Sequence, residues 1–240
     1  MYKIKNRIFV EKKLNLNDRI ELASDHVHYL KNVLRTKVGD SIIIFNDSSN
    51  CLALVENITK NSCNLNIVEY EDIKKETHSI TLFFSPIKRS PLELMIQKCS
   101  EIGISAFQPV LMDRTNLKKI NYERLKLIAI EACEQSNRNT IPEIFSPISF
   151  DEMINHNSQN NYLYCSLRDE LKRIRDHKLV KTDKIGLIIG PEGDFTSEEI
   201  NKFKRRENYY GVTLGLNILK SETAAITASS LIMDQIYYAK

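Results

Sequence analysis

The sequence predicts an α/β protein with a parallel sheet, preceded by a small strand-rich segment. Up to about residue 72 the apolar runs are short and separated by Asn, Asp, Ser or Gly turns, as in a small β-barrel or sandwich. From about residue 79 onward, short apolar runs alternate with helical periodicity, which is typical of a parallel α/β sheet. The polar run 69–78 predicts a linker, so we expect domains at 1–72 and 73–240.

In the front segment we expect one helix among several strands. The helix is predicted over 26–34, with Asp25 as its N-cap and Gly39 in the turn beyond. His26 and His28 have no carboxylate or cysteine at ligand spacing, so we expect surface histidines and no metal site. Strands are expected at 7–10, 19–22, 41–45, 52–55 and 63–67.

In the second segment, three pairs of polar residues have the spacing of capping boxes and predict helix starts. They are Ser90 with Glu93, Ser149 with Glu152 and Thr196 with Glu199, and Pro91 strengthens the first. The last predicted helix is apolar on more than one side, which fits either a dimer interface or burial within one subunit. Strands are expected at 80–84, 107–111, 162–165, 185–189 and 211–214, and helices at 91–102, 122–136, from 149, 168–177, 198–206 and 222–238.

The stretch from Lys184 to Asp194 reads as a strand, a sharp glycine turn and a helix start. The apolar run 185–189 is typical of a strand buried on both faces, and it stops at Gly190-Pro191-Glu192-Gly193. In open α/β sheets ligands bind beyond the carboxyl ends of the strands. An ordinary tight turn is the simpler interpretation, since glycine-proline pairs alone favour it.

Three such turns follow the last three predicted strands, so a parallel sheet brings them together. They are Ser166-Leu167-Arg168, 190–193 and 215–219, and they offer glycine, backbone amides and aliphatic side chains. This content suits a flat heteroaromatic ring such as adenine. The sequence has neither a phosphate-binding G-x-x-x-x-G-K-[ST] loop nor a G-x-G-x-x-G after a strand, which disfavours triphosphate and ordinary dinucleotide sites.

Composition excludes several other classes. No apolar run approaches the roughly 20 residues that span a bilayer, and the five scattered cysteines form no C-x-x-C pair, so we expect a soluble cytoplasmic protein without disulfides or zinc. The net charge of +3 is too small to prove a nucleic-acid partner. Basic groups such as Lys88-Arg89 are either a phosphate clamp or exposed charge. Arg114, beyond the second predicted strand, has the same two interpretations, and Arg138 either binds a ligand or ends a solvated helix.

Taken together, several segments resemble the ribosomal small-subunit methyltransferase E family of the SPOUT class. The matching segments are 7–10, His28 to Arg35 with Val38-Gly39-Asp40, Lys88-Arg89, Gln97 to Gly103, Glu131 to Arg138, Ile189 to Gly193, and Leu214 to Ala224. The resemblance implies a SPOUT-type parallel sheet with a C-terminal trefoil knot and an N-terminal PUA-like β-barrel that helps hold RNA. It also implies a homodimer that uses S-adenosyl-L-methionine to methylate N3 of a uridine in 16S ribosomal RNA of the small ribosomal subunit.

The resemblance also implies roles for individual residues. Catalytic roles fall on Arg138, Glu192 and Glu222, of which Glu192 and Glu222 are both candidates for the general base. Cofactor contacts fall on Leu167, Ile189, Gly190, Pro191, Glu192, Gly193, Leu214, Gly215, Ile218, Leu219, Ser221 and Ala224. RNA contacts fall on Arg7, Arg35, Lys88, Arg89, Arg138 and Lys220. From the residues alone, Ser221 could equally cap the last helix.

Four positions depart from the family pattern, which usually has glycine at Asn137 and at Asp194, arginine at Lys220 and threonine at Ser221, where serine keeps the hydroxyl. Lysine keeps the charge but loses the fork that binds phosphate through two bonds. Two other functions stay open: a SPOUT enzyme that methylates a ribose 2′-oxygen or another base, and a non-catalytic RNA-binding protein.

Overall fold

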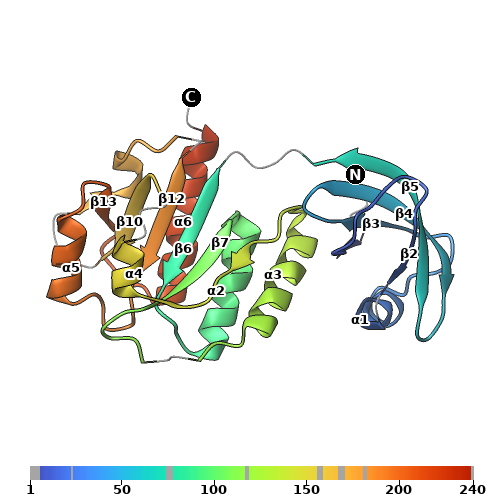
Figure 1. Ribbon diagram of the computed structural model, residues 1–240, viewed down its shortest axis with the longest axis horizontal. Coiled ribbons are helices and arrows are strands. Elements are labelled where there is room, and N and C mark those ends of the chain that lie inside the picture. Colours follow the sequence, from blue (N-terminus) through green and yellow to red (C-terminus); the bar gives the residue numbers. More distant parts are fainter. Residues whose placement is uncertain are drawn as a thin grey trace. The chain divides into compact units, whose positions relative to one another are not determined.

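The computed structural model describes residues 6–22, 24–73, 78–116, 119–155, 159–166, 171–180 and 183–238. The chain divides into two compact units, drawn as ribbons in Figure 1. Unit 1 comprises Met1–Lys75 and Cys133–Thr140, and unit 2 comprises Glu76–Ala132 and Ile141–Lys240. A domain boundary at residue 72 stays a prediction, and the sequence did not indicate that 133–140 would join the front unit.

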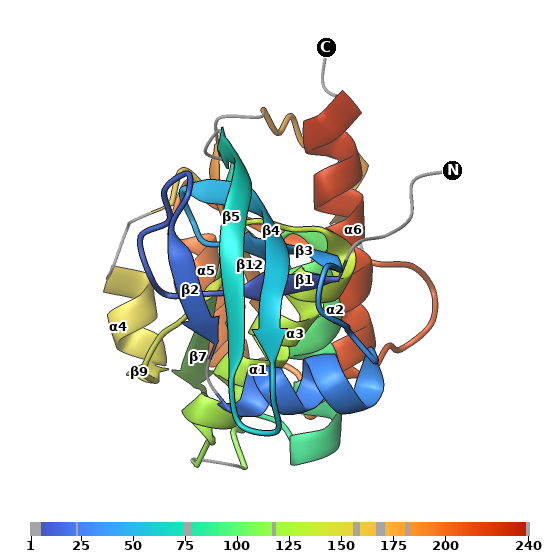
Figure 2. The ribbon, with the colours of Figure 1, turned by 90° about the vertical axis from the view of Figure 1, so that its right-hand side faces the viewer.

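Unit 1 is built on a five-stranded sheet in the order β1-β3-β4-β5-β2, shown face-on in Figure 2. β1 is parallel to β3, and the other neighbours are antiparallel. Every second residue of the strands packs into one core, with Ile44, Leu65 and Ile67 fully buried. The strands are β1 (Arg7–Phe9), β2 (Arg19–Leu22), β3 (Ser41–Phe45), β4 (Ser49–Ile58) and β5 (Cys63–Asp72).

β4 and β5 form a longer hairpin than the sequence predicted. Their pairing runs from Ser49 opposite Asp72 to Ile58 opposite Cys63. Glu69 to Asp72 therefore belong to β5, and the prediction of a linker starting at residue 69 was wrong. Charged residues hide this extension, because a strand that is exposed on both faces has no apolar alternation. Within the rest of the predicted linker, residues 74–77 lie outside the described residues.

The helix of unit 1 changes its winding halfway. α1 (Ser24–His28) continues into a π-helical turn, η1 (Tyr29–Val33), in which the Leu34 amide donates to the Tyr29 carbonyl. Because α1 already includes Ser24, the prediction of Asp25 as the N-cap was wrong. Beyond the π turn, Arg35 is exposed and has a φ of +53°, a conformation that is costly for a long side chain.

Arg7 binds the carboxyl end of a helix instead of lying on the surface. Its side chain is 5% exposed, and Nη1 donates to the carbonyl of Arg138 at 3.1 Å and to that of Cys133 at 3.4 Å. Nη2 donates to Asn139 Oδ1, and the guanidinium lies 4.1 Å from the centre of the Phe45 ring. Burial lowers the pKa of this guanidinium, which arginine tolerates without losing its charge. We therefore assign Arg7 a structural role, and the RNA contact expected of it stays a prediction.

The helix that Arg7 caps is α3 (Tyr122–Ser136), and it ends in a left-handed residue. Asn137 has a φ of +62°, and the amide of Arg138 donates back to the carbonyl of Cys133 at 3.1 Å. This bond pattern is the common helix ending in which glycine, or less often asparagine, adopts positive φ. The departure from glycine at Asn137 is therefore compatible with the fold.

Unit 2 confirms the predicted parallel α/β sheet. Its strands run in the order β11-β13-β10-β12-β6-β7-β8, with β9 also paired to β7, and every pair is parallel. The strands are β6 (Ser79–Phe84), β7 (Ala106–Leu111), β8 (Glu143–Ile144), β9 (Ile148–Ser149), β10 (Asn161–Cys165), β11 (Lys172–Arg173), β12 (Lys184–Ile189) and β13 (Tyr209–Thr213).

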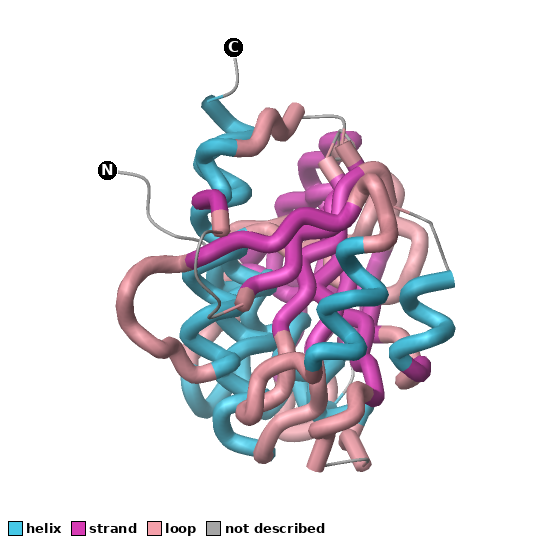
Figure 3. The backbone as a smooth tube through the Cα atoms, turned by 90° about the vertical axis from the view of Figure 1, so that its left-hand side faces the viewer, coloured by secondary structure: helices cyan, strands magenta, loops and turns pink. Residues whose placement is uncertain are grey.

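Helices cover both faces of this sheet, so the cyan helices of Figure 3 lie on either side of its magenta strands. Leu187 of β12 belongs to the core cluster that includes buried residues of α2, α3 and α6, whereas the next residue, Ile188, belongs to the cluster that includes residues of α4 and α5. The strand is therefore buried on both faces, as its apolar run predicted. The helices of this unit are α2 (Arg89–Ile102), α3, α4 (Phe150–Asn155), α5 (Ser197–Lys204) and α6 (Ser221–Tyr238).

Two of the three predicted capping boxes are confirmed. Thr196 and Glu199 cap α5, and Ser149 and Glu152 cap α4. At α2 the prediction was wrong: the helix starts at Arg89, two residues before Pro91, and Glu93 binds the Arg89 side chain at 2.7 Å instead of a backbone amide.

The helix predicted over 168–177 was also wrong where the structure describes it. Lys172–Arg173 form β11, and Ile174–Asp176 form a short 3₁₀ turn, η2. Ile174 is buried, and Arg173 on one side of it pairs with Asp176. The basic residues of this segment therefore do not line one face of a helix.

Two further observations concern the described part of the chain. None of its helices has both the length and the apolar character needed to cross a lipid bilayer. Among the same residues, no three His, Cys, Asp or Glu side chains gather closely enough to hold a metal ion.

The buried position of Arg7 leads to a stability prediction. Arg7→Met keeps an aliphatic side chain but removes one hydrogen-bond donor from each of the Cys133 and Arg138 carbonyls, which costs roughly 1–3 kcal/mol of unfolding free energy. The control Arg19→Met removes an exposed pair with Glu56 and costs at most about 1 kcal/mol. Urea denaturation of both variants measures the difference. Equal losses would contradict the structural role of Arg7.

Candidate functional site

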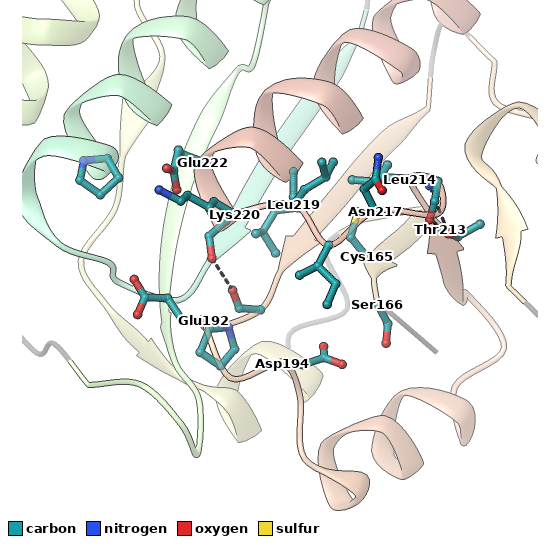
Figure 4. Close-up of a pocket in the computed structure, with 18 of the residues that line it drawn as sticks. Cys165, Ser166, Glu192, Asp194, Thr213, Leu214, Asn217, Leu219, Lys220 and Glu222 are labelled. Atoms are coloured by element: carbon teal, nitrogen blue, oxygen red, sulfur yellow. Dashed lines mark hydrogen bonds between the residues drawn. The ribbon is translucent and has the colours of Figure 1, made fainter. Parts of the chain in front are cut away.

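A pocket of about 480 Å³ lies at the carboxyl ends of three neighbouring strands of unit 2 (Figure 4). β10 lies between β12 and β13, so residues 165, 189 and 213 end at the same edge of the sheet. The starts of α2 and α6 close the remaining sides. The pocket is lined by Lys88, Pro91, Cys165, Ser166, Ile189, Gly190, Pro191, Glu192, Asp194, Thr213, Leu214, Gly215, Asn217, Ile218, Leu219, Lys220, Ser221, Glu222 and Ala224.

The first wall is the turn between β12 and α5. A Cβ atom at Gly190 would lie 3.0–3.3 Å from three atoms of the buried Phe195 ring, so only glycine fits without movement of the ring. The amide of Asp194 donates to the carbonyl of Pro191 at 2.9 Å, which closes the turn. Asp194 has a φ of +60°, which aspartate tolerates better than most residues. Asp194, where the family usually has glycine, is therefore compatible with the backbone conformation of this turn.

The second wall is the segment that leads from β13 into α6. Gly215 has a φ of +131°, a conformation that other residues rarely adopt, and its amide donates to Thr213 Oγ1 at 3.3 Å. Ser221 Oγ donates to the carbonyl of Gly190 at 3.4 Å and so links this wall to the first.

The third wall comes from the end of β10. The amide of Ser166 donates to the carbonyl of Val212 at 3.2 Å, which continues the strand pairing to the pocket edge. Burial raises the pKa of the Cys165 thiol to about 12, so the thiol stays protonated near neutral pH and acts as a small apolar surface. Leu167, expected to contact the cofactor, lies outside the described residues.

Charged side chains gather at one end of the pocket. Glu192, Lys220 and Glu222 lie on the same side in Figure 4, and Lys88 also lines the pocket. Asp194 lies below them. Two ammonium groups and three carboxylates therefore border an interior of aliphatic side chains and backbone. Such a pocket binds an uncharged ring in its interior and charged groups of the ligand at its rim.

The structure brings most of the predicted cofactor residues together. Ten of the twelve line the pocket, while Gly193 lies on the outer side of its turn against Arg114 and Leu167 is not described. Glu222, Lys88 and Lys220 also line it. Arg89, Arg7, Arg35 and Arg138 do not line it; the last three belong to unit 1, where Arg138 is 8% exposed.

Sequence reasoning assigned no role to several lining residues. Pro91 was interpreted only as a helix-start signal, Thr213 as part of a strand and Cys165 as one of the scattered buried thiols. Their places follow from the strand order, since the end of a central strand necessarily meets the ends of both neighbours. The turns containing Ser166 and Asn217 had been singled out as a whole, but not these residues individually.

The pocket chemistry fits a nucleoside-like ligand. Its interior offers the backbone of Gly190 and Gly215 and the side chains of Leu214, Leu219 and Ala224, which suit a flat ring with few charges. Its volume lies within the range of small-molecule sites.

The sequence of this chain matches two protein-family models and a known ribosomal RNA methyltransferase. Residues 74–233 match the RNA methyltransferase domain family, and residues 22–68 match the RNA methyltransferase PUA domain family. The chain is 38% identical over 229 residues to the ribosomal RNA small subunit methyltransferase E of Rickettsia conorii, with 93% of each chain covered.

Two similar solved structures contain S-adenosylmethionine. The ribosomal RNA small subunit methyltransferase E of Neisseria gonorrhoeae is 27% identical with a TM-score of 0.88, and the match covers 97% of this chain and 98% of that one. A methyltransferase of Legionella pneumophila is 29% identical with a TM-score of 0.87, covering 96% and 97%. On sequence and on structure alike, the chain belongs to the ribosomal RNA small subunit methyltransferase E family.

Proposed function

We propose that this protein transfers the methyl group of S-adenosyl-L-methionine to N3 of a uridine in 16S ribosomal RNA. The observation that carries the proposal is the pocket at the ends of β10, β12 and β13, which is made of backbone, glycine and aliphatic side chains. The family membership and the cofactor in two structures of the same fold support it. The choice of N3 follows from the resemblance to the family.

The cofactor supplies a methyl group on a positively charged sulfur, which is an excellent leaving group. The protein therefore has to place the acceptor and remove its proton. The Ser221 to Gly190 hydrogen bond holds two walls of the pocket at a fixed separation. Leu214, Leu219 and Ala224 offer apolar contacts to a ring and exclude water from it.

The N3–H proton of uridine needs an acceptor, and the pocket has two candidates. Glu192 is exposed and Glu222 is half-buried, and both line the pocket together with Lys220. A lysine next to the reacting base stabilises the negative charge that develops as the proton leaves. Glu192 and Glu222 thus both remain candidates, and Arg138 keeps its catalytic role as a prediction.

We place the RNA contacts on exposed cations. Lys88 and Lys220 lie at the pocket rim, and Arg89 is exposed at the start of α2. In unit 1, Arg35 is exposed and holds positive φ, and strained residues of this kind gather at ligand-binding surfaces. The small ribosomal subunit is the proposed partner, and a cytoplasmic location follows from that partner.

We further propose a homodimer that involves α6 and the segment before it. Leu216 is 104% exposed and Ile218 is 80% exposed, and α6 presents Leu231 and Tyr237 to solvent. A group of large exposed apolar side chains marks an interaction surface. Sedimentation of the purified protein tests this proposal, and a monomer at micromolar concentration would contradict it.

The decisive experiment for the function is methyl transfer to small ribosomal subunits that lack the modification, alongside naked 16S RNA. Mass analysis of nucleosides from the digested product should show a uridine methylated on the base at N3. A ribose 2′-O-methyl product, or another methylated base, would favour a SPOUT enzyme with a different target. Failure to bind S-adenosylmethionine in a calorimetric titration would favour a non-catalytic RNA-binding protein.

Paired variants identify the base. Glu192→Gln and Glu222→Gln should differ in their effect. The variant that removes the proton acceptor should lower the rate of single-turnover methyl transfer by about 10²–10⁴-fold, and the other variant should have a much smaller effect. Affinity for S-adenosylmethionine, measured by calorimetry, should change little in both, since glutamine keeps the shape. Full activity in both variants would exclude these two carboxylates.

Arg35 allows RNA binding to be separated from folding. Arg35→Gly removes the positive-φ strain, so its melting temperature should stay equal or rise. RNA affinity should fall, and the slope of log affinity against log salt should decrease by about one. The control Arg19→Ala, at an exposed arginine of the same unit, should leave the RNA affinity and the salt slope unchanged. An unchanged salt slope in Arg35→Gly would remove this residue from the RNA surface.

A further inference from the structure

The loop after β7 holds the turn after β12 from outside the pocket. Arg114 is exposed, yet its Nη1 donates to the carbonyl of Gly193. A Cβ atom at Gly193 would lie 3.2 Å from Arg114 Cδ, so the aliphatic stem of the arginine packs directly on the glycine. Both the head and the stem of Arg114 therefore contact this turn.

A buried carboxylate joins the same two segments. Glu199 is 2% exposed, and its Oε1 accepts from the amide of Asp113 at 3.0 Å while Oε2 accepts from the amide of Thr196 at 2.8 Å. Thr196 Oγ1 in turn donates to Asp113 Oδ2 at 3.0 Å. A buried carboxylate with two backbone donors at a helix start is well satisfied, and it fixes the distance between the donors.

The loop after β7 is itself anchored to the sheet. Thr115 Oγ1 accepts from the amide of Met112 at 2.8 Å and lies 2.8 Å from Ser85 Oγ. The amide of Ser85 donates to the carbonyl of Ile189, the last residue of β12, at 3.1 Å. The loop therefore has a fixed position relative to the strand that leads into the turn.

We infer that Arg114 and Glu199 are positioning residues that hold the turn 190–194 in the conformation that binds the cofactor. Together with Asp113 and Thr196 they form what we call the brace. None of these four residues lines the pocket, whereas Gly190, Pro191, Glu192 and Asp194 all do. Affinity for the cofactor is thus set partly from outside the pocket. This last statement rests on the proposed function.

The first test needs no cofactor. Arg114→Met keeps the aliphatic stem on Gly193 and removes only the donor to its carbonyl. In the free protein, the amide of Asp194, which bonds the Pro191 carbonyl, should exchange its hydrogen at least about tenfold faster than in the wild type. The melting temperature should not change, because Arg114 is exposed. An unchanged exchange rate at Asp194 would overturn the brace, whatever the protein binds.

The second test is a double-mutant cycle with calorimetric titration of S-adenosylmethionine. Arg114→Met and Glu199→Gln should each weaken binding roughly tenfold. Glutamine presents an NH₂ group to one of the two amides and so releases either Asp113 or Thr196. Because both residues act through one brace, the double variant should also lose about tenfold and not about a hundredfold. The turnover number at saturating cofactor should stay within about threefold, while KM for the cofactor rises.

Two further variants complete the test. Arg114→Lys retains one donor and should restore part of the affinity. Lys202→Met removes a half-buried cation of α5 that pairs with Asp151 at 2.8 Å, and it should leave affinity within about twofold of the wild type. A hundredfold loss in the double variant, or wild-type affinity in Arg114→Met, would overturn the brace. Lack of binding by the wild type would instead defeat the proposed function, and the exchange measurement would still decide on the brace.

Discussion

Parallel strand pairing is the constraint on which the site depends. In unit 2 the pairings align Cys165 with Ile189 on one side and with Val212 on the other, so three chain segments leave the sheet at the same edge. Each segment must turn there, and the amides and carbonyls of the turning residues have no strand partner. A ligand with a hydrogen-bonding ring edge can satisfy those groups. The position of the pocket follows from the topology, and its chemistry follows from the residues at the three turns.

A site made of backbone has to be held in shape by groups that do not touch the ligand. Gly190 lies against the Phe195 ring, and Ser221 links the two longer walls. Residues with positive φ occur where the chain leaves regular structure, at Asp194 in the first wall and Gly215 in the second. Because few side chains are available to bind the ligand by themselves, small shifts of these turns affect binding directly. This gives a physical reason for the density of hydrogen bonds on the outer side of the turn 190–194.

Local signals predicted most of unit 2 and the main part of the site. The buried run of β12, the Thr196–Glu199 capping box and the glycine turn between them are short-range features, and each is where the sequence placed it. The failures have different physical origins. Ser90 has the spacing of a helix cap, but Arg89 and Glu93 form an ion pair one turn apart and α2 starts earlier. The end of β5 is charged on both faces and so resembles a linker.

Other features depend on long-range contacts that no local pattern contains. Arg7 belongs to a segment shared with an RNA-binding family, but only the fold reveals that its guanidinium is covered by residues more than 120 positions away. The contact of Arg114 with Gly193 spans 79 positions and has no sequence signature. The trefoil knot, the general base and the dimer stay predictions of the family resemblance, since they depend on threading, chemistry and assembly.

The composition of unit 1 has a consequence for anyone who wishes to isolate it. The unit takes Cys133–Thr140 from the far end of α3, and Phe9 and Arg7 of β1 bond to Glu134, Arg138 and Asn139 within it. A fragment cut after the front strands would lose the hydrogen bonds that these residues accept from Arg7 and from the Phe9 amide. Unit 1 therefore cannot be transferred to another protein as residues 1–75 alone. Fusions, truncations and domain exchanges must also include Cys133–Thr140, or the fold of the unit is incomplete.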